Sequence, residues 1–367
     1  MNKKLVAVAI AGLLAAPLAQ AQTANVTLYG RVNLDVEFVN GKQANGSNPN
    51  VYRLGTNSSR FGIRGTEALG GGLNAIFQVE SSINPAQSGG TLAGRESFVG
   101  LQGAWGTFKM GRFLAPYDDI HPIFGNVPTL TTSILSTAAL WAQGFAGQPT
   151  NGGFDDRVQN SVRYDTPNLS GFTASVQYGG YAPTPGASSN AGVWSTGAFY
   201  NNGPLQLGMA YEQHNSIRIK GKSDMGFSFA GGYDFGIVRV GAVYEALKYE
   251  TLTGDLERNF WGLGLTGNLG PGQMYFFYGD AQKGTGDAAN GTRVAGLAKG
   301  DQTDSQQYEI SYTYPLSKRT LTYAGYVKIN NSNNASYTFN INPYPVGFTN
   351  GSYGKPGGFV LGAVHFF

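Results

Sequence analysis

The sequence predicts an all-β protein, a transmembrane antiparallel β-barrel of about sixteen strands. Three observations lead to this fold class. Polar and apolar residues alternate with a period of two over many segments, short and long connections alternate between those segments, and no apolar run after Ala21 is long. A membrane-spanning helix would need about 20 consecutive apolar residues, whereas barrel strands need about 9–11 residues of alternating character.

The first 21 residues have the pattern of a cleaved signal peptide. Lys3 and Lys4 precede an apolar run over residues 5–16, and Ala19-Gln20-Ala21 supplies the small residues that signal peptidase requires. At 12 residues the run is too short to cross about 30 Å of hydrocarbon, which disfavours the alternative of a retained anchor. We expect cleavage after Ala21, leaving residues 22–367 as a single barrel domain.

Composition excludes several functional classes. The chain of 367 residues has no cysteine, so disulfides, thiolate metal sites and cysteine catalysis are excluded. Removing Lys3 and Lys4 with the signal lowers the formal charge from +3 to +1, which argues against nucleic-acid binding. Glycine reaches 55 residues and aromatic residues 13%, a composition that suits strands, tight turns and a membrane interface.

Residues 26–38 show the alternation most clearly. One face is apolar, and the other carries Tyr29, Arg31, Asn33, Asp35 and Glu37. This is a strand with water on one side. The pattern recurs over residues 172–178, 225–234, 238–245 and 320–329, and mid-strand charges fall mainly in the polar phase.

The connections fall into two classes. Seven short ones are expected at residues 67–72, 104–106, 166–170, 201–204, 235–236, 269–272 and 315–319. Eight longer polar ones are expected at residues 40–50, 84–94, 114–156, 181–192, 214–223, 251–256, 282–303 and 330–356. Fifteen connections imply sixteen strands, enough to enclose an aqueous channel.

Two segments stand out within this pattern. Residues 114–156 form the longest connection, yet they carry Leu130, Ile134, Leu135, Leu140 and Trp141, too apolar for a solvated tail. We expect this loop to pack against the inner wall. The last strand, residues 357–367, alternates up to Phe367, whose aromatic ring is expected to serve as an assembly signal.

Several runs resemble the beta-proteobacterial general porins. They are Val26-Thr27-Leu28-Tyr29-Gly30, residues 59–67 and 69–73, Gly111-Arg112, Tyr164-Asp165-Thr166-Pro167 and Leu316-Ser317-Lys318-Arg319-Thr320. The resemblance covers the whole chain in order. It implies a homotrimer of sixteen-stranded barrels, each with its third long loop folded into the lumen as a constriction.

Selectivity in such channels comes from charges at the narrowest point. Arg60, Arg95 and Arg157 lie at positions similar to the family's arginine cluster, and Arg31 and Arg64, in lumen phase, could extend it. Counting back from Val99 places Arg95 in the outward phase, so it must lie at the irregular start of its strand or in the loop.

The opposing acidic side is assigned to Asp118 and Asp119 on the long loop and to Glu80 in the lumen phase of the third strand. If the arginines dominate, the channel should prefer small anions. For each of these charges, a solvated residue without a role in selectivity is the alternative.

Two other signals carry little weight. Gly262, Gly264 and Gly267 form a G-x-G-x-x-G run, but it opens no helix and lies inside an alternating strand, where glycines allow bending or leave lumen space. The histidines, His121, His214 and His365, have no metal-ligand spacing, and no cofactor is expected.

The sequence therefore predicts an outer-membrane channel for passive diffusion of small hydrophilic solutes and ions, with mild anion preference. Its partners would be outer-membrane lipid and lipopolysaccharide. A substrate-specific channel is the main alternative. A barrel enzyme is disfavoured because no nucleophile motif accompanies a histidine, and an adhesin or receptor barrel is left open by the polar loops.

Overall fold

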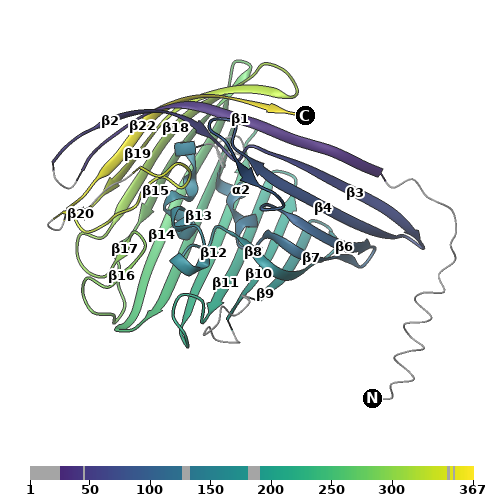
Figure 1. Cartoon of the computed structure of the whole chain (residues 1–367), viewed down its shortest axis with the longest axis horizontal. Helices are drawn as coiled ribbons and strands as arrows, with labels where there is room; N and C mark the ends of the chain where they lie inside the picture. The colour runs from purple at the N-terminus through teal and green to yellow at the C-terminus, as the bar shows by residue number, and fades with distance from the viewer. Residues whose placement is uncertain (1–24, 44–45, 126–132, 181–190, 345–347, 350–351) are drawn as a thin grey trace.

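The computed structural model describes residues 25–43, 46–125, 133–180, 191–344, 348–349 and 352–367 (Figure 1). The expected signal peptide and Leu130 lie outside these residues. Within the described part, no helix is long and apolar enough to cross a bilayer.

The strands form one antiparallel sheet that closes on itself. Its members are β1 (Asn25–Lys42), β2 (Asn50–Thr56), β3 (Arg60–Gly70), β4 (Leu73–Ile83), β5 (Gly90–Thr91), β6 (Ser97–Gly103), β7 (Gly106–Leu114), β8 (Arg157–Asp165), β9 (Phe172–Gly180), β10 (Gly192–Asn202), β11 (Leu205–Asn215), β12 (Ser223–Asp234), β13 (Val238–Thr251), β14 (Gly254–Leu269), β15 (Gly272–Ala281), β18 (Ser305–Pro315), β19 (Thr320–Asn331) and β22 (Lys355–Phe366).

Two pairs of these elements are parts of single barrel strands. β2 and β3 pair with successive parts of β1, and β5 and β6 pair with successive parts of β4. Merging each pair gives sixteen barrel strands in the described residues, as the sequence predicted. Two small hairpins, β16 (Arg293–Val294) with β17 (Leu297–Ala298) and β20 (Phe348–Thr349) with β21 (Ser352–Tyr353), lie in long connections.

The first and last strands close the barrel. β1 pairs with β22 from Arg31↔Phe366 to Lys42↔Lys355, and Figure 1 shows the two strands side by side. Gly30 and Phe367 extend this ladder with two backbone hydrogen bonds of 3.0 and 3.1 Å. Closure leaves neither strand with an unpaired edge.

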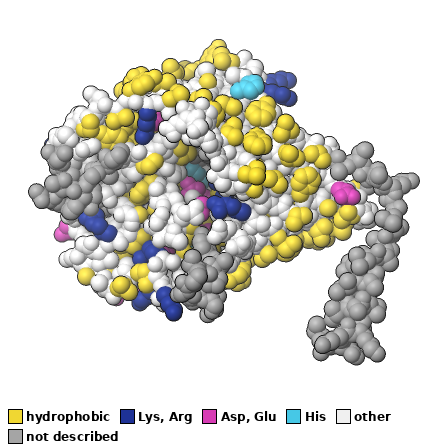
Figure 2. All heavy atoms as spheres, in the orientation of Figure 1, with side chains coloured by type: hydrophobic (Ala, Val, Ile, Leu, Met, Phe, Trp, Pro, Cys, Tyr) yellow, Lys and Arg dark blue, Asp and Glu magenta, His cyan; other side chains and the backbone are white. Residues whose placement is uncertain are grey.

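The alternating faces of the strands point to two different environments. In β1 the side chains of Asn33, Asp35 and Glu37 are buried toward the interior, while Val26 and Leu28 are exposed on the outside. Figure 2 shows hydrophobic side chains spread along the barrel wall. Such an inverted surface is expected of a barrel that has lipid outside and water inside.

Aromatic side chains mark the two edges of the apolar band. At the ends with long loops, outward-facing rings pack in pairs: Tyr178–Trp194, Trp261–Tyr278, Tyr278–Tyr308 and Tyr326–Phe359, with centroids 4.6–5.1 Å apart. Trp105 and Tyr164 stack at the end with short turns. Two aromatic girdles at the height of the lipid headgroups are typical of outer-membrane barrels.

One expected long connection is in fact a tight turn. β13 runs to Thr251 and β14 begins at Gly254, so only two residues join them. The Thr251 hydroxyl donates a 2.6 Å hydrogen bond to the Gly254 carbonyl. The alternation hid this because Glu250, Asp255 and Glu257 place charges on the outward face, where the strands extend beyond the lipid.

Candidate functional site: the channel constriction

The connection between β7 and β8 folds into the barrel, as predicted from its apolar residues. This constriction loop, residues 115–156, contains η1 (Asp118–Ile120), α2 (His121–Phe124), η2 (Ser133–Leu135), η3 (Thr137–Ala139), η4 (Trp141–Ala146) and η5 (Pro149–Asn151). Figure 1 shows these short helices inside the curved sheet. Ile134, Leu135, Leu140 and Trp141 are fully buried.

A buried ion pair ties the constriction loop to the wall. Glu245 on β13 and Arg258 on β14 are both inaccessible to solvent and form a salt bridge. Glu245 Oε1 accepts hydrogen bonds from the Tyr117 hydroxyl and the Ala142 amide, each 2.8 Å long, and Arg258 Nη1 donates to the Leu140 carbonyl at 2.7 Å.

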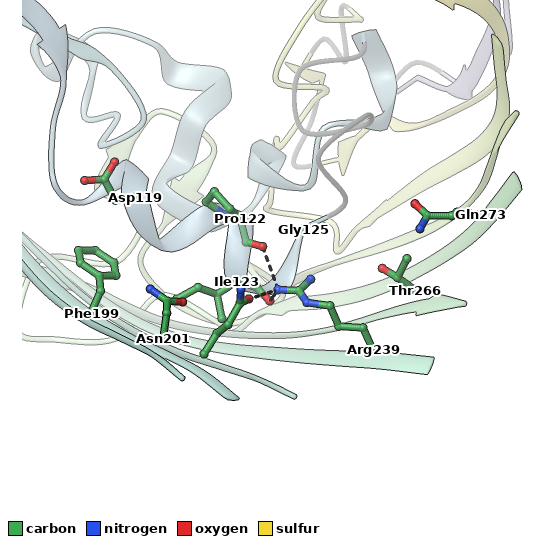
Figure 3. A pocket seen from close by; sticks show the side chains of 10 residues that line it. Asp119, Pro122, Ile123, Gly125, Phe199, Asn201, Arg239, Thr266 and Gln273 are labelled. Atoms are coloured by element: carbon green, nitrogen blue, oxygen red, sulfur yellow. Dashed lines mark hydrogen bonds between the residues drawn. The ribbon is translucent and has the colours of Figure 1, made fainter. Parts of the chain in front are cut away.

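Further contacts hold the loop along the same side of the barrel. Trp141 Nε1 donates to Ser228 Oγ on β12 at 3.1 Å, and the Tyr275 hydroxyl on β15 donates to the Phe124 carbonyl at 3.1 Å. Arg239 on β13 donates to the Pro122 and Ile123 carbonyls, as the dashed lines in Figure 3 show. The loop therefore lies against β10–β15 and reaches β18 and β19, so that the wall of β3–β6 faces the open side of the lumen.

Glycines in the lumen phase make room for α2. A Cβ atom at Gly241 would lie 2.5 Å from the Ile123 carbonyl oxygen, and one at Gly264 would lie 2.1 Å from the Phe124 carbonyl oxygen. Gly208 leaves space for the Ile123 side chain in the same way. We call these three residues the glycine pad. The interpretation of Gly264 as a lumen-space glycine is thus confirmed.

On the open side of the lumen, basic residues gather around Glu80. Its carboxylate lies 2.6 Å from Arg95 Nε and 3.3 Å from Arg60 Nε, and it accepts a 3.0 Å hydrogen bond from the Tyr29 hydroxyl. Arg95 precedes β6 in an irregular segment, as expected from its parity. Burial, with Arg157 and Arg60 nearby, lowers the pKa of Arg95 to about 10 despite Glu80.

The other two predicted arginines flank this group. Arg31 is the register partner of Arg60 and donates hydrogen bonds to the Asn57 and Ser58 carbonyls, each 3.2 Å long. These two hydrogen bonds fix the irregular backbone between β2 and β3. The Arg64 guanidinium lies over the Tyr29 ring, 4.9 Å from its centroid, one step closer to the short turns.

Arg157 and Asp118 line a shared cavity of about 370 Å³ with Ser58, Asp155 and Asn340. Asn340 lies in the connection from β19 to β22, and its Nδ2 donates to Asp155 Oδ2 at 3.0 Å. Burial and the neighbouring Asp155 raise the pKa of Asp118 well above its usual value, and Arg157 opposes this. Two carboxylates and one guanidinium group thus line this one cavity.

Asp119 points away from this cavity. Its carboxylate lies 2.6 Å from Arg163 Nη2 on β8, and Arg163 also binds Asp165 at 2.7 Å. Asp119 lines a second cavity of about 450 Å³ with Arg239 and Gln273, on the side of the short turns (Figure 3). It joins the loop to the wall.

The expected pattern of two opposed charge rows needs correction. Glu80 lies on the strand next to Arg60 and is bound between two guanidinium groups, so it belongs to the basic wall. Asp119 is bound to Arg163 on β8 and does not line the cavity with Arg157. Among the described residues, Asp118 is the one predicted acid that shares a cavity with a predicted arginine, Arg157. The register of β3 and β4 places Glu80 beside Arg60, and the path of the loop places Asp119 beside Arg163.

The sequence analysis missed several residues of the site. Asp155 and Asn340 line the cavity, and Glu245 and Arg258 hold the loop. The alternation did place Glu245 in the polar phase. A signal for Asn340 existed as well: Tyr337, Phe339 and Tyr344 place aromatic residues in an otherwise polar connection, and all three are buried.

The backbone of Phe367 completes the β1–β22 ladder. Its role as an assembly signal stays a prediction. Across the residues that the structure describes, no group of three or more His, Cys, Asp and Glu side chains could hold a metal ion.

A closed barrel with an apolar outer band, aromatic girdles and a charged constriction defines a diffusion channel of the outer membrane. Figure 2 shows acidic and basic side chains in a hollow of the molecule. Residues 6–334 match the family model described as Gram-negative porin, and the chain belongs to this family.

Relatives cover nearly the whole chain. The outer membrane porin protein 32 of Delftia acidovorans is 29% identical over 347 residues, which cover 90% of each chain. An outer membrane porin protein of Bordetella pertussis is 30% identical and covers 88% of this chain and 93% of its own. The structure of an anion-selective porin from Comamonas acidovorans superposes with a TM-score of 0.74 at 25% identity, covering 94% of this chain and all of that one.

The protein is therefore an outer-membrane porin of a Gram-negative bacterium. Its water-filled lumen lets small hydrophilic solutes and ions diffuse across the outer membrane.

Proposed function

We propose that this porin prefers small anions and that Arg60, Arg95 and Arg157 create the preference. The observation that carries the proposal is the charge balance on the open side of the lumen. Arg60 and Arg95 bind the carboxylate of Glu80, Arg31 lies in its field, and Arg157 lies near Arg95, so guanidinium groups outnumber carboxylates on this wall. Because the constriction loop narrows the water-filled lumen, passing ions come close to these partly buried charges, which salt screens less than fully exposed ones.

The similar porin from Comamonas acidovorans is described as anion-selective, which supports the same preference here. We propose a passive channel without catalytic activity, since the relatives are porins.

Replacing Arg60 and Arg157 with serine should shift the zero-current potential in a KCl gradient toward cation preference. Each lost charge is expected to change the anion-to-cation permeability ratio about fivefold, equivalent to roughly 1 kcal/mol. Lys283→Ser, a change in an exposed ion pair, is the control. A zero-current potential that is equal in the double variant and the unmodified porin would exclude these arginines as the source of selectivity. The difference should shrink in concentrated salt.

We also propose that three copies assemble through the wall formed by β1–β7. β6 and β7 have 7 and 9 residues, at or below the length that spans a bilayer, whereas β13 and β14 have 14 and 16. The outward side chains of this wall include Val26, Leu28, Ile63, Val79 and Val99. Where β6 and β7 make this apolar wall short, a neighbouring barrel covers it better than lipid does.

Recordings from planar bilayers test the assembly. A homotrimer should close in three equal steps at high voltage, and single-step closures throughout would contradict it. The lipid-facing strands β9–β22, with their aromatic pairs, would then contact lipid and lipopolysaccharide. We further propose that residues 1–21 direct export and are removed, leaving residues 22–367.

A further inference from the structure

The cavity between Arg157 and Asp118 has features of a solute-binding site. Its volume is about 370 Å³, and its walls come from the constriction loop, the start of β8 and the connection between β19 and β22. Leu114, Phe145 and Ile341 supply an apolar surface beside the charged groups. Small-molecule sites typically combine such a surface with a few placed polar groups.

Polar atoms in this cavity lack partners. Asp118 is 7% exposed, and its Oδ2 has no hydrogen-bond partner among the described residues. The same holds for Arg157 Nε within that part of the chain. A buried polar atom without a partner is costly, so these atoms favour a solute or water that satisfies them.

The two charges also have different surroundings. Asp118 shares its end of the cavity with Asp155, and the repulsion between two carboxylates is relieved by a bound cation or proton. Asp155 is fixed in place by the hydrogen bond from Asn340. Arg157 stands in the field of Arg95 and the basic wall, which favours an anion beside it.

We propose that this cavity binds small zwitterions, with the solute carboxylate at Arg157 and its ammonium group at Asp118 and Asp155. The class of solute is a short amino acid carrying both charges. The inference rests on the proposed anion-preferring channel for the role of Arg157, and it adds a saturable site to that channel. An entering zwitterion would satisfy both unpartnered atoms at once, which neither a simple anion nor a simple cation does.

The test measures block of the ion current through the complete porin in planar bilayers by γ-aminobutyrate, with butyrate, butylamine and butyramide as probes of similar skeleton. γ-Aminobutyrate should block the current saturably and at lower concentration than the other three. Equal block by butyramide and γ-aminobutyrate would overturn the proposal.

Asp118→Asn should weaken the block by γ-aminobutyrate at least about fivefold and leave the block by butyrate unchanged or stronger. The substitution is isosteric at an atom without a partner, so the fold should tolerate it. Asp119→Asn is the matched control, because the neighbouring carboxylate binds Arg163 outside this cavity. Equal weakening in both variants, or in neither, would contradict the assignment of Asp118.

The two proposals fail separately. Loss of zwitterion block with an anion-preferring zero-current potential would overturn the binding site alone. Saturable block in a channel without ion preference would overturn the proposed selectivity and keep the site.

Discussion

Replacing Glu245 with glutamine is expected to loosen the constriction loop. The variant retains an oxygen that accepts hydrogen bonds from Tyr117 and Ala142, but it removes the only negative charge that pairs with Arg258 within the described residues. Arg258 is fully buried, and breaking a buried ion pair by removing one partner typically costs about 3–5 kcal/mol. The neighbouring strands keep their ladder, so the cost falls on the loop.

Thiol labelling can measure this release, since the chain has no cysteine of its own. Ala139, in η3 of the constriction loop, is fully buried, so a thiol introduced by Ala139→Cys should react slowly with a membrane-impermeant maleimide. Adding Glu245→Gln should raise the labelling rate about a hundredfold, as a loss of roughly 3 kcal/mol in local stability implies. Single-channel recordings should show increased noise in the open state.

Arg258→Met distinguishes the charge from the contacts. Alone it leaves Glu245 charged without its partner, and it should also speed labelling. Combined with Glu245→Gln it removes both charges, so the double variant should label more slowly than either single variant. Asp301→Asn, in an exposed ion pair with Lys283, is the control and should change nothing. Labelling of the Glu245 variant at the unmodified rate would show that other contacts hold the loop.

The sequence predicts the barrel well because each strand separates water from lipid. That requirement repeats every two residues, so the alternation in residues 26–38 is visible without any knowledge of neighbours. The prediction fails where the outward face also meets water, as at residues 251–256. There the strands continue with charged residues on their outer face, and these polar residues resemble a loop.

The constriction is harder to predict because its contacts join distant segments. Asn340 and Asp155 are separated by 185 residues, and no pattern of period two relates them. The alternation placed Glu80 in the lumen correctly. It could not show that Glu80 would lie between Arg60 and Arg95, since this depends on the register of β3 and β4 and on the irregular segment before β6.

The glycine pad gives a second large expected effect, because it sets how far α2 stands from the wall. A Cβ atom at Gly241 would meet backbone atoms of Ile123 and Phe124, at 2.5 and 2.6 Å, and backbone cannot rotate away as a side chain does. Gly241→Val should therefore push α2 toward the open lumen. Forcing extra methyl groups into a packed contact costs about 1–3 kcal/mol, which is less than the loop's combined anchoring, so the loop should shift and stay folded.

A displaced α2 narrows the channel at the height of Pro122 and Asp118. Gly241→Val and Gly264→Val should each lower single-channel conductance. The smallest neutral solute that is excluded from the pore should also be smaller in these variants. Gly267→Val is the matched control: it lies on the same strand as Gly264, and its Cβ would have only the Ile237 carbonyl oxygen nearby, at 3.7 Å. Conductance that falls equally in all three variants would point to general strain in the barrel. A fall confined to Gly241 and Gly264 would show that bare backbone at the inner wall sets the width of this pore.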